Sequence, residues 1–139
     1  MSEPLKAGIS ATRRIEIDRD RTIGFMGEEC RVYSTPNLLL DVEGTCRDLL
    51  LEHIEPGKDS VGTRVELDHL GATILGMWAE ITVTVTEVNG SAIAFDFSVR
   101  DAVEQVARGK HNRFVVGIEK TALRLKAKLA KAQAAPAKP

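Results

Sequence analysis

The sequence predicts an α+β fold in which an antiparallel sheet of about five strands wraps around one long central helix. One observation is a long stretch with helical periodicity at residues 35–53. The other is a set of stretches before and after it that alternate with a period of two. The helix has one apolar stripe, and the chain offers a single sheet to cover it. A sheet curled around the helix is therefore the economical arrangement.

The helix is expected to run from Thr35 to His53. Threonine can cap the free amides and Pro36 suits the first turn, while the Glu55-Pro56-Gly57 run ends the helix. Its apolar stripe consists of Leu39, Val42, Cys46, Leu49, Leu50 and His53. Glu43 borders this stripe, so its carboxylate is paired, neutral or used in chemistry, unless it reaches out to solvent at the stripe's edge.

Strands are expected at residues 11–18, 60–69, 75–88, 91–100 and 105–119, the last four joined as an antiparallel meander. Asn89-Gly90 is a strong hairpin signal. The 60–69 strand is expected to place on one face Val61, Thr63, Val65, Leu67 and His69. This order of elements is the layout of the hot-dog fold. The exposed edge of such a sheet favours a homodimer joined through residues 60–69.

The chain is expected to form one domain over residues 11–131, with a flexible arm at 1–10 and a disordered tail at 132–139. Residues 19–33 form a loop that can cover a site, and residues 120–131 a short basic helix.

Composition narrows the class of protein. The formal charge of −1 over 139 residues gives little support to nucleic-acid binding. No apolar run reaches the length of a membrane span, and no signal core is present, so a cytoplasmic location is expected. Cys30 and Cys46 have neither disulfide nor metal-site spacing, and no metal is expected.

Four runs of the chain resemble the fluoroacetyl-CoA thioesterase-like branch of hot-dog thioesterases: VYSTPNLLLDVEGTCRDLL, EPGKDSVGTRVELDHLGAT, ITVTVTEVNG and ARGKHNRFVV. The resemblance covers most of the chain. It implies a catalytic set of Thr35, Glu43 and His69. It places the family's glycine-threonine pair on Gly62 and Thr63, and its G-x-H-x-R pattern on Gly109, His111 and Arg113. It also implies hydrolysis of a small acyl-CoA, with no cofactor beyond the coenzyme A thioester itself.

Thioester hydrolysis can be assigned to these side chains. Glu43 is suited to act as a base for water or to attack directly. The Gly62 amide and the helix N-terminus can polarise the carbonyl, and His69 can orient Thr35 or Glu43 or carry a proton. Arg113 is a candidate for substrate binding, or for pairing with a carboxylate in the core. The plainer alternatives are a helix-capping Thr35 and a core histidine at position 69.

The family's pattern includes phenylalanines just ahead of the helix, where this chain has Glu29, Cys30, Arg31, Val32 and Tyr33. We therefore expect a general acyl-CoA thioesterase rather than a fluoroacetyl-specific one. The alternatives are a non-catalytic acyl-CoA-binding module and an acyl-thioester hydratase. A hydratase needs an aspartate beside a histidine, but Asp68 and His69 are adjacent in a strand and face opposite sides.

Overall fold

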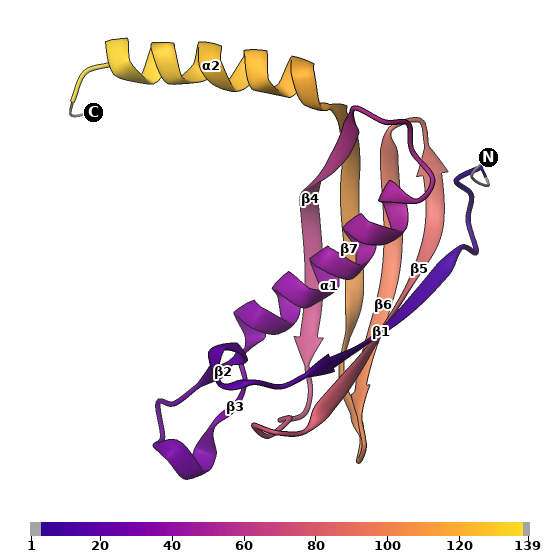
Figure 1. The fold of residues 1–139 in the computed structure, drawn as a ribbon, viewed down its shortest axis with the longest axis vertical. Coiled ribbons are helices and arrows are strands. Elements are labelled where there is room, and N and C mark those ends of the chain that lie inside the picture. The colour runs from indigo at the N-terminus through magenta and orange to yellow at the C-terminus, as the bar shows by residue number, and fades with distance from the viewer. Residues whose placement is uncertain (1–3, 138–139) are drawn as a thin grey trace.

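A five-stranded antiparallel sheet curls around one long helix, as predicted (Figure 1). The computed structural model describes residues 4–137. The strands lie in the order β1-β5-β6-β7-β4, with β1 at Ser10–Glu16, β4 at Lys58–His69, β5 at Trp78–Asn89, β6 at Ala92–Asp101 and β7 at Gln105–Gly117. The central helix α1 spans Thr35–Leu51, and a second helix, α2, spans Ile118–Ala134.

The cap of α1 differs from the prediction. Ser34 is the N-cap, since its Oγ accepts a hydrogen bond from the Asn37 amide at 3.2 Å. Thr35 is therefore the first helical residue, and its hydroxyl does not cap the helix. The residues that α1 buries are Leu38, Val42, Thr45, Cys46, Leu49 and Leu50. They pack in one core with apolar residues of β5 and β6 such as Ile81 and Phe95.

The expected four-strand meander was wrong for β4. Only β5, β6 and β7 follow one another as neighbours, and β4 pairs with β7 at the far edge of the sheet. The connection at residues 70–77 is longer than a hairpin loop, so it can pass across the end of the sheet. The amides of Leu70 and Gly71 both donate to the Val106 carbonyl, which fixes this crossing.

The expected face of β4 was also partly wrong. The register shifts between Gly62 and Arg64, so the strand carries one extra residue, Thr63. Before this bulge Val61 lies opposite Phe114, and both are exposed on the side away from α1. The α1 side of β4 therefore carries Ser60, Gly62, Val65, Leu67 and His69, and neither Val61 nor Thr63.

The segment before α1 is anchored to the helix. It contains the short strands β2 (Thr22–Ile23) and β3 (Val32–Tyr33). The buried Tyr33 hydroxyl donates to Asp41 at 2.5 Å, and Arg21 Nε donates to the same carboxylate at 2.9 Å. Burial and the Asp41 charge raise the pKa of Tyr33 well above its usual value, so the hydroxyl stays a donor. This cluster holds β3, and hence the start of α1, in place.

The structure near both ends of the chain can be compared with the predicted arm, C-terminal helix and tail. At the N-terminal end, the Gly8 amide donates to the Val85 carbonyl, and Leu5 and Ile9 pack against the core. Residues 1–3 of the predicted arm and 138–139 of the predicted tail lie outside the described residues. The helix α2 is longer than the expected 120–131, and the domain boundaries stay a prediction. Within residues 4–137 no helix is long and apolar enough to cross a membrane.

Candidate active site

The first part of the candidate site is a hydrogen bond between Thr35 and His69. The Thr35 Oγ1 lies 2.7 Å from the His69 Nδ1. Thr35 projects from the first turn of α1 and His69 ends β4, so the end of the strand meets the start of the helix. An open depression of about 330 Å³ adjoins the pair, lined by Val32, Tyr33, Thr35, His69, Leu70, Gly71 and Ala72.

His69 is placed to accept a proton at neutral pH. Partial burial lowers its pKa below the usual histidine value, and a hydrogen bond with the Gly71 backbone offsets only part of this effect. The ring is therefore neutral at pH 7, and one of its nitrogens is free to accept. A neutral imidazole within 2.7 Å of a hydroxyl is an arrangement that can activate the hydroxyl or orient it.

The second part is a cluster around Arg113. This side chain is buried, and its Nε and Nη2 donate to the side-chain oxygen and backbone carbonyl of Ser60 at 2.7 and 2.9 Å. Its Nη1 lies 3.5 Å from the Glu43 carboxylate, a long ion pair. The Glu43 side chain is only half-buried. Glu43 is thus paired, which was one of the expected alternatives, while part of it stays open to the surface as in the other.

His111 completes this cluster as an acceptor. Its Nδ1 lies 2.8 Å from the Arg64 carbonyl, which can only accept, so Nδ1 carries the proton. Its Nε2 is then left to accept from Arg113 Nη1 at 3.1 Å. Burial lowers the pKa of His111, and the charge of Arg113 lowers it further, so the ring stays neutral. His111 therefore orients Arg113 and, through it, Glu43.

Gly62 lies directly beneath the Glu43 carboxylate. A methyl group at this position would come within 3.3 Å of Glu43 Oε2 and 3.2 Å of His111 Cε1. The missing side chain lets the Glu43 carboxylate and the His111 ring lie this close to the β4 backbone. Cys46 is close in sequence but is fully buried, and burial raises the pKa of its thiol to about 12, so it stays protonated.

The two parts of the site are far apart within one chain. Thr35 and Glu43 are eight residues apart on α1, which corresponds to about 12 Å along the helix axis. Gly62 lies in the first half of β4 and His69 at its end, about 20 Å apart. One protomer therefore brings Thr35 to His69, and Glu43 to Gly62 and Arg113, but does not unite the two groups.

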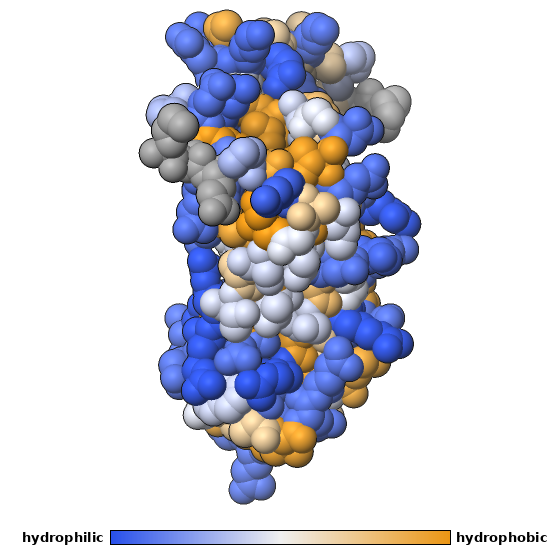
Figure 2. Space-filling view, turned by 90° about the vertical axis from the view of Figure 1, so that its right-hand side faces the viewer, coloured by the Kyte–Doolittle hydropathy of each residue, from blue (hydrophilic) through white to orange (hydrophobic). Residues whose placement is uncertain are grey.

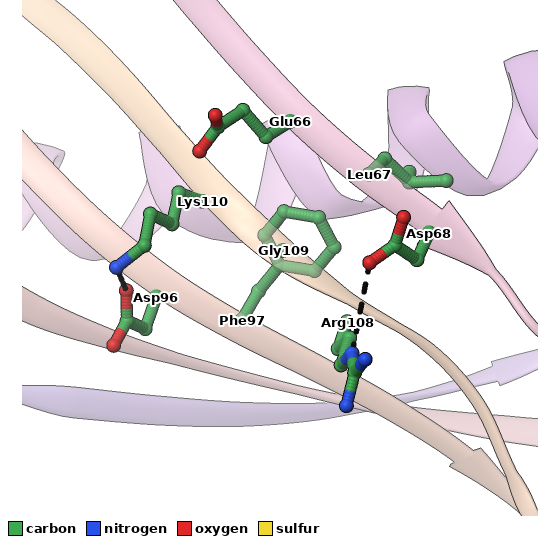
Figure 3. Close-up of a pocket in the computed structure, with 8 residues that line it drawn as sticks. All are labelled: Glu66, Leu67, Asp68, Asp96, Phe97, Arg108, Gly109 and Lys110. Carbon is green, nitrogen blue, oxygen red and sulfur yellow. Dashed lines mark hydrogen bonds and ion pairs between the residues drawn. The ribbon is translucent and has the colours of Figure 1, made fainter.

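A hollow of about 500 Å³ on the outer face of the sheet is not part of this site. Figure 3 shows its charged side chains in front of the strands, with the central helix behind them. Asp68 pairs there with Arg108 at 3.6 Å, and Lys110 with Asp96 at 3.2 Å. Asp68 thus points away from His69, and no aspartate–histidine pair of the hydratase kind forms here.

The sequence prediction missed Ser60 and gave no role to His111. The alternation in β7 contained a signal for the histidine, since residues two apart share a face, and His111 therefore lies beside Arg113. Ser60 gave no such signal, because the bulge at Thr63 reverses the alternation of β4.

Comparisons with known proteins agree with this fold. The family model of fluoroacetyl-CoA-specific thioesterases matches residues 17–119. A fluoroacetyl-CoA thioesterase of Streptantibioticus cattleyicolor is 29% identical over 89 residues, and the match spans 64% of either protein's length.

Solved structures give the same result. A fluoroacetyl-CoA thioesterase structure superposes with a TM-score of 0.83 at 23% identity, covering 91% of this chain and 98% of that one. A thioesterase-superfamily protein of Thermus thermophilus superposes with a TM-score of 0.84 at 19% identity, covering 95% and 98%. A hot-dog-like protein of Thermanaerovibrio acidaminovorans superposes with a TM-score of 0.80 at 23% identity, covering 88% of this chain and 91% of that one. These likenesses confirm the hot-dog fold, and with the family match over residues 17–119 they show that the chain belongs to the fluoroacetyl-CoA-specific thioesterase family.

Proposed function

We propose that this protein hydrolyses the thioester of a small acyl-CoA to the free acid and coenzyme A. The observation that carries the proposal is the neutral His69 bonded to the Thr35 hydroxyl, on a chain that also holds Glu43 over Gly62. The family match supports the reaction class. Variants of the related fluoroacetyl-CoA thioesterase have been solved with acetyl-CoA and with fluoroacetate and CoA, which supports a short acyl group.

In this proposal Glu43 acts on water. The carboxylate takes a proton from a water molecule, whose oxygen attacks the thioester carbon. The Gly62 amide, or the first-turn amides of α1, hold the oxyanion. The C–S bond then breaks, and the thiolate leaves as the thiol after taking a proton. Thr35 and His69 position the thioester and relay that proton. A direct attack by Glu43 would instead form an anhydride and release the thiolate, and ¹⁸O from labelled water would then enter Glu43 when water opens the anhydride at the glutamyl carbon.

The two parts of the site come together when a second copy pairs with β4. Within residues 4–137 β4 has a neighbour on one side only, and Val61 and Val65 on it are 45% and 39% exposed. An antiparallel β4–β4 pair with its two-fold axis at Glu66 places Gly62 opposite His69 of the second copy, because the bulged residue Thr63 is passed over in the pairing. Each site then combines Glu43, Gly62 and Arg113 of one copy with Thr35 and His69 of the other.

The opposite edge of the sheet is a poorer candidate for this pairing. The β1 edge presents Ser10, Thr12, Arg14 and Glu16 to solvent. Figure 2 looks onto this side and shows hydrophilic residues along both flanks, with the apolar ones in separate groups. Unlike β4 with Val61 and Val65, β1 exposes no large apolar side chain. We therefore propose a homodimer through β4, in the cytoplasm, where the free Cys30 and Cys46 would stay reduced.

The reaction itself is tested with a panel of short acyl-CoAs and a thiol-reactive dye. Release of coenzyme A at a rate that is proportional to the enzyme concentration is expected. Binding of the same acyl-CoAs in calorimetry without thiol release would favour the non-catalytic acyl-CoA-binding module instead.

The two-copy site is tested by mixing two inactive variants. Glu43→Gln and His69→Ala each remove a different part of both sites in their own homodimer. In a mixed dimer one site carries both substitutions and the other carries none, so mixing should restore about a quarter of the wild-type activity. If both residues act within one chain, the mixture stays inactive.

A further inference from the structure

The helix α2 is amphipathic, and within the described residues 4–137 it buries none of its side chains. Its side chains at Ile118, Leu125 and Leu129 are 52%, 61% and 58% exposed. Together with Ala122 they follow the alternating four- and three-residue spacing of a helix–helix seam. A hollow of about 310 Å³ separates the first turns of α2 from the start of β4. We call these four residues the α2 stripe.

The direction of α2 takes it past the free edge of the sheet. Its first amide, at Ile118, donates to the Gly57 carbonyl at 2.9 Å, next to the start of β4. From there it runs across the end of the sheet and beyond β4 (Figure 1). Its seventeen helical residues span about 25 Å, which equals about five times the distance between neighbouring strands. The step from β7 to β4 takes up only one of these five distances. Most of α2 therefore extends over the place where a neighbouring copy would lie.

The topology fixes which part of a second copy would meet α2. In an antiparallel β4–β4 pair, the start of β4 lies beside the end of β4 in the other copy. That end continues into the connection at residues 70–77, next to the β6–β7 turn at residues 101–104. Exposed apolar residues gather there, since Val103, Leu70 and Ile74 are 78%, 53% and 55% exposed.

This end of the sheet is a rigid surface. The Asp101 carboxylate accepts from the amides of Val103 and Glu104 at 2.8 and 3.0 Å, which fixes the turn. The same carboxylate accepts from the buried Thr73 hydroxyl at 2.9 Å, which ties the connection to the turn. Val103 is thus held at the tip of an ordered turn, beside the exposed carboxylate of Glu104.

Charge is complementary between the two surfaces. The polar side of α2 carries one acidic residue, Glu119, and five basic ones: Lys120, Arg124, Lys126, Lys128 and Lys131. The turn offers the Glu104 carboxylate. In a β4–β4 pair, a basic helix with an apolar stripe would therefore meet an apolar surface with an acidic residue.

We propose that α2 is an inter-subunit helix, whose stripe packs on the β6–β7 turn and the 70–77 connection of a second copy of this chain. The proposal rests on the β4 dimer of the proposed function. It adds that each copy closes one end of the other's site, because residues 70–72 line the Thr35–His69 depression.

The test compares matched substitutions on two sides of α2. Leu125→Glu with Leu129→Glu places charges on the stripe, whereas Leu123→Glu places one on another side of the helix, where Leu123 is 65% exposed. Sedimentation velocity over a dilution series gives the dimer dissociation constant, and circular dichroism verifies the fold. The stripe variant should dissociate at concentrations about 100-fold higher than the wild type, and the Leu123→Glu variant should behave as wild type.

Two outcomes distinguish a failure of the α2 contact from a failure of the β4 dimer. If the wild type dimerises and the stripe variant dimerises equally well, α2 does not pack on the second copy, while the β4 dimer stands. If the wild type is a monomer at micromolar concentration, the β4 dimer fails and α2 loses its proposed partner with it.

Discussion

Thr35 and His69 are joined by a hydrogen bond of 2.7 Å, while the neighbouring Ser34 caps α1. The two adjacent hydroxyls thus have separate partners. The Ser34 oxygen accepts from a helix amide, and the Thr35 oxygen meets an imidazole at the end of β4. Because one residue stabilises the helix and the other faces the candidate site, stability and activity can be separated by substitution.

Ser34→Ala should destabilise the protein by about 1 kcal/mol, with little change in the rate per folded molecule, because α1 loses its cap and Asn37 Nδ2 loses the same oxygen as its acceptor. Thr35→Ala should leave the melting temperature nearly unchanged and lower kcat/KM by about 100-fold. Thr35→Ser, which keeps the hydroxyl, should retain much of the activity. Thermal melts and thiol-release assays measure both effects. Normal turnover of the Thr35→Ala variant would show that the Thr35 hydroxyl has no part in catalysis.

Gly62→Ala should lower turnover by about 10-fold or more while the fold remains. The added methyl group would come within 3.3 Å of the Glu43 carboxylate, so the carboxylate must move from its present position. The matched control is Gly44→Ala on α1, where the nearest atom is 3.9 Å away and space is available. Alanine stabilises a helix relative to glycine, so this control should gain about 0.5–1 kcal/mol with normal activity. Equal activity of the two variants would show that turnover does not depend on the position of Glu43 over Gly62.

Arg113→Lys should destabilise the protein by about 2–3 kcal/mol in denaturant unfolding. Lysine keeps the charge beside Glu43 but cannot reproduce the fork that donates to Ser60 from two nitrogens. The Ser60 oxygens would then lose buried donors. Ser60→Ala removes only one of these bonds and should cost about 1 kcal/mol. A lysine variant as stable as the wild type would show that the fork contributes nothing to stability.

The sequence predicted the parts of this molecule that depend on local periodicity. The five strands and the helix, which was expected to reach His53 and ends at Leu51, follow from side-chain spacing. The meeting of Thr35 with His69 follows from the family pattern. The position of β4 did not follow, because its pairing with β7 depends on a long crossing connection. The face that carries Gly62 did not follow either, because a single bulged residue at Thr63 reverses the alternation. The cap at Ser34 was missed because two neighbouring hydroxyls compete for that role.

Acidification should destabilise the fold through His111. Its pKa is lowered in the folded state, so the unfolded chain binds the proton more readily. The stability that the neutral ring contributes is complete above the ordinary histidine value of about 6.5 and is lost as the pH falls through the folded-state pKa. Urea unfolding between pH 8 and pH 5 at about unit intervals measures this slope. His111→Gln should flatten it, and an unchanged slope would assign the acid sensitivity to other groups.

His69→Ala separates the catalytic interpretation of this residue from the structural one. If His69 merely fills space, its removal leaves a cavity and costs about 1–3 kcal/mol, with the rate per folded molecule unchanged. If it works with Thr35, the rate should fall by about 100-fold or more at constant folded fraction.

The wild-type rate should also fall on acidification, at a pH below the usual histidine pKa, because burial lowers the pKa of His69 and only the neutral ring can take a proton. The profile of Glu43→Gln must be measured beside that of His69→Ala, so that the contributions of the two residues are separated. We expect the limb due to histidine to persist in the residual activity of Glu43→Gln and to vanish in that of His69→Ala. A His69→Ala protein that melts early yet hydrolyses acyl-CoA at the normal rate, with the same acid limb, would leave Glu43 to act without the histidine.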